Sequence, residues 1–379
     1  MMVGSLPVDL RMVKGGVEAV ILNLFEGFRQ LDDIRVLHVA FTKELKTIKT
    51  ITVAANITVH FIPFVNKFEL VDYAINTKTL DSLIEREKPD LIHIQEITPQ
   101  ILRFLRFPPN RIVVTQHGVM AEELKYMKGI PQKTKGIFKA AIERFIFPRF
   151  ENVIFISDYN RRRFRGKPKL QKKIFNPVNP VFLNTPLAGR GKSNDILYVG
   201  VISRRKNLGV VIEALGRLKD QYTFTLHVAG GFKDATYEGQ IKALIDDADL
   251  SDHIVFHGWQ TQEEIARLYA ESPLFVLPSL QETLPVSVAE AMARGRIVIA
   301  SDVGGIREMF TDMVSGFLFQ RNNARELAEV FRKVFELNED NGIGRRAQAE
   351  ALERFNPLNI ARETLSFYRE VLATKHQRA

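Results

Sequence analysis

Two glutamates, Glu282 and Glu290, lie eight positions apart just after an apolar run, residues 274–277, that predicts a buried strand. Pro285 stands between them, where its fixed φ suits the first turn of a helix. Glu282 is then expected on the loop at the carboxyl end of the strand, and Glu290 roughly 7.5 Å along the helix axis. The two carboxylates could therefore accept hydrogen bonds from hydroxyl groups of one ligand at different depths.

The start of this predicted helix also offers a place for an anion. The amides of Val286 and Ser287 belong to the first turn, where they have no partner within the helix, and the helix dipole favours a phosphate there. A simpler alternative exists for each glutamate alone, since Glu282 could cap the helix and Glu290 could be a solvated side chain. The pair gains meaning only from the longer stretch that contains it.

A cluster of positive charge, Arg205 and Lys206, follows the predicted strand at residues 196–199 and precedes Asn207. Asn207 is expected to cap a helix, and the dipole at a helix start disfavours cations. A bound anion such as a diphosphate would relieve that repulsion. The alternative is a set of solvated surface cations.

Three further candidates lie in the first half of the chain. His117 follows the predicted strand at residues 111–115, which puts it at a strand's carboxyl end. Gly15 and Gly16 lie between a strand and a helix, where the missing Cβ atoms let the backbone approach a phosphate or a sugar. Taken alone, a loop histidine is more often structural, and a glycine pair is as often an ordinary turn.

Strand-like runs alternate with helical patterns along nearly the whole chain, which is typical of βαβ units and a parallel sheet. The predicted strands are 34–40, 57–64, 91–94, 111–115 and 153–156, then 196–199, 222–229, 254–256, 274–277 and 297–300. They indicate an α/β protein of two doubly wound domains whose ligand crevices face a shared cleft. We predict a first domain over residues 1–180, a linker near 177–193, a second domain over 181–355, and a helix within 356–379 that packs back on the first domain.

The composition narrows the class of protein. The 379 residues include no cysteine, which excludes disulfides and thiolate chemistry and favours a reducing, cytoplasmic compartment. No apolar run of about 18 residues and no signal-like start is present. Asp247 and Asp249 resemble a metal-binding pair but close a helical pattern, so we predict no metal site.

The net charge of +9 comes from one segment, because residues 125–174 carry fifteen Lys and Arg against three acidic residues. The same segment interleaves aromatic and aliphatic side chains with the charges, a mixture suited to an anionic membrane surface. Ile142 and Phe145 of this segment are expected to pack inward. A nucleic-acid-binding protein is the alternative suggested by the pI near 9.5.

The stretch that begins at Glu282 resembles the signature of the family-four retaining glycosyltransferases, a glutamate and a second one after seven intervening residues. The positions that carry this resemblance are Glu282, Glu290, residues 291–293, Gly295, Val298, Ser301, residues 303–305 and Glu308, together with 15–16, 89–93, 115–118 and 200–206. It covers essentially the whole chain. Such enzymes have the GT-B fold of two Rossmann-like domains.

The resemblance implies a role for each candidate. Glu290 would bind the ribose hydroxyls of the nucleotide, and Glu282 a hydroxyl of the donor sugar. Arg205 and Lys206 would bind the pyrophosphate. His117 would lie near the donor sugar and the reacting centre, across the cleft from Glu282.

One position of the sequence departs from the family pattern and affects which residues are expected to bind the phosphates. Val201 stands where the family usually has an arginine, so the phosphate contacts are expected to depend on Arg205 and Lys206. The implied reaction is a retaining transfer of a hexose-type sugar from a nucleotide diphosphate sugar to a hydroxyl acceptor, with no cofactor and no metal. Base, sugar and linkage remain open.

The predicted acceptor is a lipid-linked or polysaccharide precursor of the cell envelope, reached at the inner face of the membrane, and nucleic acid is not a predicted partner. Whether residues 125–174 bind the membrane or a polyanionic acceptor is left open by the sequence. A sugar-nucleotide epimerase on the same scaffold is the alternative enzyme. A nicotinamide dehydrogenase is disfavoured because no Gly-x-Gly-x-x-Gly follows a predicted strand.

Overall fold

A computed structural model describes residues 1–64, 69–96, 101–183, 194–337 and 342–374 of the chain. The described chain divides into two compact units. Unit 1 comprises Met1–Leu10, Gly16–Pro177 and Pro357–Ala379, and unit 2 comprises Arg11–Gly15 and Val178–Asn356. Residues 184–193 of the predicted linker lie outside the described residues.

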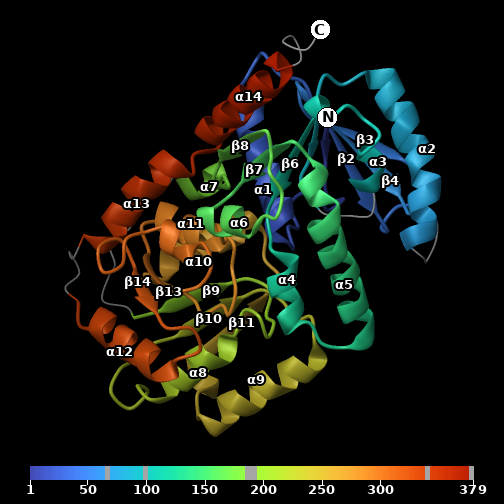
Figure 1. The fold of residues 1–379 in the computed structure, drawn as a ribbon. Helices are drawn as coiled ribbons and strands as arrows, with labels where there is room; N and C mark the ends of the chain where they lie inside the picture. Colours follow the sequence, from blue (N-terminus) through green and yellow to red (C-terminus); the bar gives the residue numbers. More distant parts are fainter. Residues whose placement is uncertain (65–68, 97–100, 184–193, 338–341, 375–379) are drawn as a thin grey trace. The chain divides into compact units, whose positions relative to one another are not determined.

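Unit 1 is built on a mostly parallel sheet (Figure 1). Among the described residues its eight strands run in the order β3-β4-β2-β1-β5-β6-β7-β8, and β3 is antiparallel to β4. Their bounds are β1 Met2–Val3, β2 Val36–Thr42, β3 Lys49–Ala54, β4 Ile57–Pro63, β5 Ile92–Ile94, β6 Ile112–Gln116, β7 Asn152–Phe155 and β8 Leu170–Lys173. The buried strands β2, β5, β6 and β7 are rich in Val, Ile and Phe, as strands covered on both faces require.

The helices of unit 1 are α1 Gly16–Phe28, α2 Glu69–Glu87, α3 Ile101–Phe104, α4 Met120–Glu123, α5 Ile130–Phe145, α6 Asp158–Arg163 and α14 Pro357–Ala373. They connect these strands, except for α14, which follows unit 2. The apolar stripe of α1 buries Ile21, Phe25 and Phe28 completely in the core. The ring of Phe28 lies 6.4 Å from that of Tyr368 on α14.

Helix α14 belongs to unit 1 although about 180 residues separate it from the rest of that unit. A Cβ atom on Gly27 of α1 would lie 2.1 Å from the carbonyl oxygen of Pro357 and 2.6 Å from the Cβ of Ala361. Only glycine permits this approach of the two helices. The end of the chain therefore completes the core of unit 1.

Unit 2 carries a fully parallel sheet of six strands among the described residues, in the order β11-β10-β9-β12-β13-β14. In chain order this is 3-2-1-4-5-6, the doubly wound order of Rossmann folds. The strands are β9 Ile196–Val199, β10 Leu226–Ala229, β11 Ile254–Gly258, β12 Leu274–Leu277, β13 Ile297–Ser301 and β14 Phe317–Phe319. The helices are α7 Pro180–Leu183, α8 Leu208–Gly216, α9 Ala235–Asp247, α10 Gln262–Glu271, α11 Val286–Ala293, α12 Ala324–Phe335 and α13 Ile343–Arg354.

In such a sheet the order in which strands are added reverses between the neighbouring strands β9 and β12, and ligands bind at the carboxyl ends of the strands beside that switch point. The loop after β9 carries Arg205 and Lys206, and the loop after β12 carries Glu282. The topology of unit 2 therefore brings these two loops together. None of the helices in the described part of the chain has the length and apolar composition of a membrane span.

Candidate functional site

The loops that follow β9 and β12 meet through both backbone and side chains. The amide of Leu280 donates to the carbonyl oxygen of Arg205 at 2.7 Å. Lys206 Nζ lies 2.6 Å and Arg205 Nη1 lies 3.4 Å from the same oxygen of Glu282, Oε1. Arg205 Nη1 also donates to the carbonyl oxygen of Gln281 at 2.9 Å. Three residues that the sequence singled out separately thus form one cluster.

The charge state of Glu282 follows from this cluster. Burial alone would raise the pKa of its carboxyl group, since only 6% of the residue is exposed. The positive charges of Lys206 and Arg205 and the hydrogen bond from Lys206 outweigh burial and lower the pKa below its usual value. Glu282 is therefore an ionised acceptor at neutral pH.

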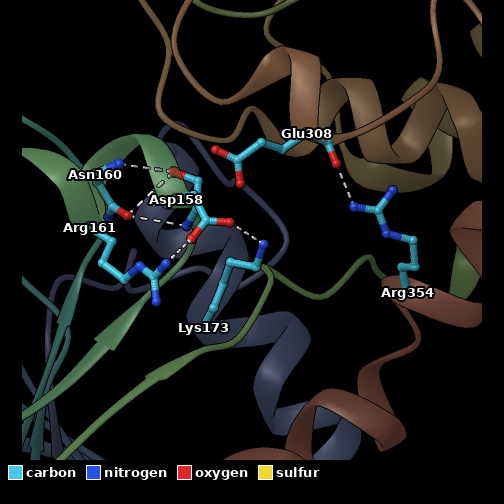
Figure 2. A network of polar contacts seen from close by, with 7 residues as sticks. Asp158, Asn160, Arg161, Lys173, Glu308 and Arg354 are labelled. Atoms are coloured by element: carbon cyan, nitrogen blue, oxygen red, sulfur yellow. Dashed lines mark hydrogen bonds and ion pairs between the residues drawn. The ribbon is translucent and has the colours of Figure 1, made fainter.

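The loop after β13 packs directly on Glu282. Gly304 has φ +61°, and a Cβ atom there would lie 1.6 Å from the carbonyl oxygen of Glu282. No other residue type fits, because both the left-handed backbone and the contact exclude a side chain. Glu308 and Met309 follow a few residues after Gly304, and their carbonyl oxygens accept hydrogen bonds from Arg354 of α13. Figure 2 shows the Glu308 carboxylate pointing away from Arg354.

Glu290 is the fifth residue of α11 and is 7% exposed. Burial raises the pKa of its carboxyl group to about 7, and a hydrogen bond with Tyr269 offsets only part of that rise. The Tyr269 hydroxyl oxygen also lies 2.9 Å from the carbonyl oxygen of Ser287, so Glu290 and Ser287 compete for its single proton. The two glutamates of the motif thus differ electrostatically, since Glu282 faces two cations whereas Glu290 titrates near neutrality.

The amides predicted to bind a phosphate lie where the sequence indicates. Helix α11 begins at Val286 after Pro285, so Val286 and Ser287 form its first turn. Among the residues that the structure describes, neither amide donates a hydrogen bond. These donors remain available to an anion at the helix start.

Arg204 and Asn207 do not join this cluster. Arg204 Nη1 donates to Gln240 Oε1 at 2.7 Å, and its guanidinium lies 5.0 Å from the ring centroid of Tyr237. Asn207 occupies the N-cap position of α8 in a left-handed conformation, but its side chain makes no cap. Its amide nitrogen donates instead to Asn322 Oδ1 at 3.1 Å. The expected side-chain cap by Asn207 was wrong, because a capping residue needs an extended backbone and Asn207 is left-handed, with φ 53° and ψ 45°.

In unit 1, His117 directly follows β6 and is half-buried. Burial lowers the pKa of its imidazole to about 4, against a hydrogen bond with the Asn176 side chain that raises it. The ring is therefore neutral at pH 7. Its Nε2 lies 2.7 Å from Gln95 Oε1.

A carboxylate that the sequence did not single out holds the loop around His117. Glu143 of α5 accepts from Gln116 Nε2 at 2.8 Å and from the amide of Met120 at 2.6 Å. Burial raises the pKa of Glu143. Residues on both sides of His117 are thereby tied to α5. In the sequence Glu143 is one of three acidic residues within the basic segment, and no local pattern distinguishes it from the other two.

Gly16 is the exposed first residue of α1, and Gly15 precedes it. A Cβ atom added to Gly16 would meet nothing within 4 Å. Packing within the described structure therefore does not explain the glycine at this position, and the predicted ligand contact at Gly15 and Gly16 stays a prediction.

Much of the basic segment is paired with acidic side chains. Figure 2 shows Asp158 between Lys173, whose Nζ lies 2.5 Å from Oδ2, and Arg161, whose Nη2 lies 2.9 Å from Oδ1. Lys125 and Lys169 also contact carboxylates, those of Glu122 and Glu151. Glu151 and Asp158 belong to the segment itself, so these pairs leave its net positive charge unchanged, and Glu122 adds one acidic partner from outside it.

Helix α5 of the segment presents an apolar face to solvent. Ile130, Ile137, Phe138 and Phe145 are all exposed, Phe145 to 63%. These positions fall seven, eight and fifteen residues after the first, so they share one side of the helix. Ile142 is buried as expected, but the inward packing expected for Phe145 was wrong, because Phe147 fills the core instead.

A cavity of about 390 Å³ lies elsewhere in unit 1. It is lined at the amino ends of β1, β2 and β5 by residues such as Met2, Val36 and Leu91, and by Tyr368 of α14. Ligand sites of parallel sheets lie at the carboxyl ends, where His117 is found. We therefore do not assign this cavity to the candidate site.

Two family models match the chain over separate ranges. Residues 14–180 match the model described as Glycosyltransferase Family 4. Residues 185–350 match the model described as Glycosyl transferases group 1. The two matches divide at the predicted linker.

Individual proteins and solved structures resemble the chain to different extents. The amylovoran biosynthesis glycosyltransferase AmsK of Erwinia amylovora is 38% identical over 145 residues, which span 37% of this chain and 35% of that protein. Among solved structures, sucrose-phosphate synthase from Thermosynechococcus elongatus has a TM-score of 0.81 at 19% identity, covering 98% of this chain and 99% of that one. Anabaena HepE in complex with UDP-glucose has a TM-score of 0.75 at 21% identity, covering 99% and 100%. These likenesses confirm the predicted fold class of two Rossmann-like domains.

Proposed function

Because the chain belongs to the group 1 glycosyl transferases, we propose that it transfers a hexose-type sugar from a nucleotide diphosphate sugar to a hydroxyl acceptor, with retention at the anomeric carbon. The observation that carries the proposal is the convergence of Arg205 and Lys206 on Glu282. Cations beside an ionised carboxylate suit a ligand that has both phosphates and hydroxyl groups. The complex of HepE with UDP-glucose supports a ligand of this kind.

Arg205 and Lys206 stabilise the leaving group in this proposal. As the bond between the anomeric carbon and the phosphate oxygen breaks, negative charge develops on the diphosphate. The two cations and the amides of Val286 and Ser287 offset that charge, so a divalent metal is not required. The acceptor oxygen bonds to the same face of the sugar, and its proton passes to the departing phosphate.

The two glutamates bind different parts of the donor. Glu282, held ionised, accepts a hydrogen bond from a sugar hydroxyl and orients the ring. Glu290 titrates near pH 7 and binds the ribose hydroxyls. His117, neutral at pH 7, contacts the donor sugar at the reacting centre, and Gly15 and Gly16 admit the ligand close to the backbone at the start of α1.

For the acceptor we propose a lipid-linked or polysaccharide precursor at the inner, anionic face of a membrane. The exposed apolar side of α5 supports membrane contact, because Lys133, Lys135 and Arg144 flank it with exposed positive charge. The relative named for amylovoran biosynthesis supports a polysaccharide product.

The experiment that tests the proposal is donor identification followed by product analysis. Thermal denaturation with UDP, GDP and ADP sugars reports the donor, since a ligand at 100 times its dissociation constant adds about 2.7 kcal/mol of stability. That donor is then incubated with a lipid-linked acceptor in the presence of a chelator, and NMR reads the anomeric configuration of the product. Inversion, or loss of activity on chelation, would contradict the proposed reaction.

A sugar-nucleotide epimerase would behave differently in the same assay. It would convert the donor to an epimer without any acceptor, whereas a transferase releases nucleoside diphosphate in proportion to glycosylated acceptor.

A further inference from the structure

Buried polar side chains connect His117 to the C-terminal helix of unit 1. His117 Nε2 lies 2.7 Å from Gln95 Oε1, and Gln95 Nε2 lies 3.2 Å from His93 Nδ1. The same His93 Nδ1 contacts the hydroxyl of Tyr368 on α14, and its Nε2 lies 2.7 Å from Thr115 Oγ1. Gln95, His93, Thr115 and Tyr368 are all at least nine-tenths buried.

With the side-chain amide of Gln95 oriented as in the structure, the chemistry of each group gives the direction of these bonds. An amide nitrogen can only donate, so His93 Nδ1 accepts from Gln95 and the ring proton of neutral His93 sits on Nε2, facing Thr115. The amide oxygen of Gln95 can only accept, so it holds the proton of His117 on Nε2, while the Asn176 side chain is the second hydrogen-bond partner of the same ring. Burial lowers the pKa of His93 well below its usual value, which keeps that ring neutral.

Tyr368 decides between this arrangement and its reverse. If the Gln95 amide were rotated, its oxygen would face His93 Nδ1, which would then need a proton, and its nitrogen would face an unprotonated His117 Nε2. Among the described residues His93 Nδ1 is the one hydrogen-bond partner of the buried Tyr368 hydroxyl, so a phenol that accepted there would leave its own proton unpaired. Donation from Tyr368 to His93 Nδ1 satisfies that proton and opposes the rotation. Burial raises the pKa of Tyr368, so its hydroxyl keeps the proton it donates.

We propose that Gln95 is a positioning residue that fixes the ring orientation and proton placement of His117, and that Tyr368 fixes Gln95 through His93. The proposal rests on the role of His117 in the proposed transfer. It gives α14 a task in catalysis, since the tyrosine lies 275 residues along the chain from the histidine it contacts.

Parallel pairing explains why Gln95 can reach the site. His93 pairs with Val113 and Ile94 with Val114, so the residue after β5 lies beside the end of β6, which leads directly into His117. The backbone N–H of Gln95 also donates to the carbonyl oxygen of Val3 at 2.8 Å. Gln95 is therefore held by its backbone as well as by its side chain.

The direct test reads the proton of His117 without any substrate. Protein labelled with ¹⁵N-histidine, with His117→Gln to assign the signal, reports which ring nitrogen carries the proton. We expect the Nε2–H form in the parent protein and a mixture of forms in both Gln95→Leu and Tyr368→Phe. Gln95→Glu keeps an acceptor and should restore the Nε2–H form. An unchanged His117 signal in Gln95→Leu and Tyr368→Phe overturns the proposal.

Turnover gives the second readout. Gln95→Leu and Tyr368→Phe should each lower kcat roughly 10- to 100-fold, while the affinity for nucleoside diphosphate, which unit 2 contacts, stays unchanged. Gln95→Glu should retain more activity than Gln95→Leu, and its negative charge should move the acid limb of the pH profile upward from the pKa of about 4 of His117.

A structural control and a control for the proposed function complete the design. Asn152 is a buried residue of unit 1 whose amide donates to the carbonyl oxygens of Pro109 and Ile112. Asn152→Leu should destabilise the unit without changing the His117 signal. If His117→Ala itself retained full turnover, the role of His117 in transfer would fail, whereas the ring-proton measurement would still decide the role of Gln95.

Discussion

Lys206 Nζ lies 2.6 Å from Glu282 Oε1, and both side chains are largely buried. A phosphate that binds Lys206 must compete with this carboxylate, and a sugar hydroxyl that binds Glu282 must compete with this ammonium. A donor that carries both groups satisfies both partners at once. The pair therefore favours an intact nucleotide sugar over either of its halves.

Replacing Glu282 separates binding from transfer. In Glu282→Ala the two cations lose their competitor, so the affinity for the nucleoside diphosphate should stay the same or rise. Transfer should be abolished because the sugar loses its orienting acceptor. Calorimetric titration and a radiolabelled transfer assay measure the two effects, and unchanged turnover would sink the assignment.

Replacing Lys206 should have the opposite effect on binding. Lys206→Met leaves Glu282 with Arg205 alone, so stability should fall by about 3 kcal/mol and diphosphate affinity should weaken at least tenfold. Urea unfolding and titration measure both. Lys219→Met is the matched control, since Lys219 pairs with the exposed Asp249 and its loss should leave diphosphate affinity unchanged.

Glu290 makes stability fall as the pH rises. Its folded pKa of about 7 exceeds the ordinary 4.5, so the unfolded chain ionises first and stability is lost between pH 4.5 and 7. The loss over that range is about 3 kcal/mol. Glu290→Gln should remove this dependence, raise stability at pH 8 and weaken nucleotide binding. The free energy of unfolding is measured at pH 5 and pH 8 in both proteins. The same change between the two pH values in the parent and in Glu290→Gln would contradict the expectation.

The apolar side of α5 predicts lipid contact. Changing Ile137, Phe138 and Phe145 together to serine should reduce binding to vesicles with anionic lipid while leaving the melting temperature nearly unchanged, because these side chains are exposed. Vesicle flotation measures the effect. Val255 and Phe256 of unit 2 are also exposed, so their serine variant is the control. Equal loss of binding in both variants would rule out α5 as the specific contact.

Gln281 predicts a gain in stability. Its side chain is buried, and neither its oxygen nor its nitrogen has a hydrogen-bond partner among the described residues. Gln281→Met removes two unsatisfied polar atoms at similar volume, so the free energy of unfolding should rise by about 1–3 kcal/mol. Denaturant melts check this, and a loss of stability would mean that the amide is satisfied in solution.

Buried apolar runs made much of the fold predictable. The strands at 196–199 and 274–277 were located to the residue, because each is fully buried and its ends are marked, by Asp195 and Gly200 in the first and by Pro273 and Pro278 in the second. Strands β3 and β8 were missed because they lie at sheet edges and carry alternating exposed residues such as Lys49 and Lys173. Strand β14 is only three residues long, too short for a periodic signal.

The candidate site divides in the same way. Glu282 and Glu290 are recognisable because they share one loop and one helix, so local spacing carries the information. Glu143, Gln95 and Tyr368 act through hydrogen bonds between distant parts of the chain, and no local pattern distinguishes them from other polar residues. Their roles depend on parallel pairing and on α14, which only the folded chain supplies.

The contact of α14 with α1 at Gly27 also affects the order in which the two units can complete folding during synthesis. Unit 1 begins first on the ribosome, yet it stays incomplete until residues from Pro357 onward emerge, after the whole of Val178–Asn356. At typical elongation rates that interval is about 10–40 s. Unit 2 can therefore finish folding first, and the apolar groove awaiting α14 is the surface that a nascent-chain chaperone would need to shield.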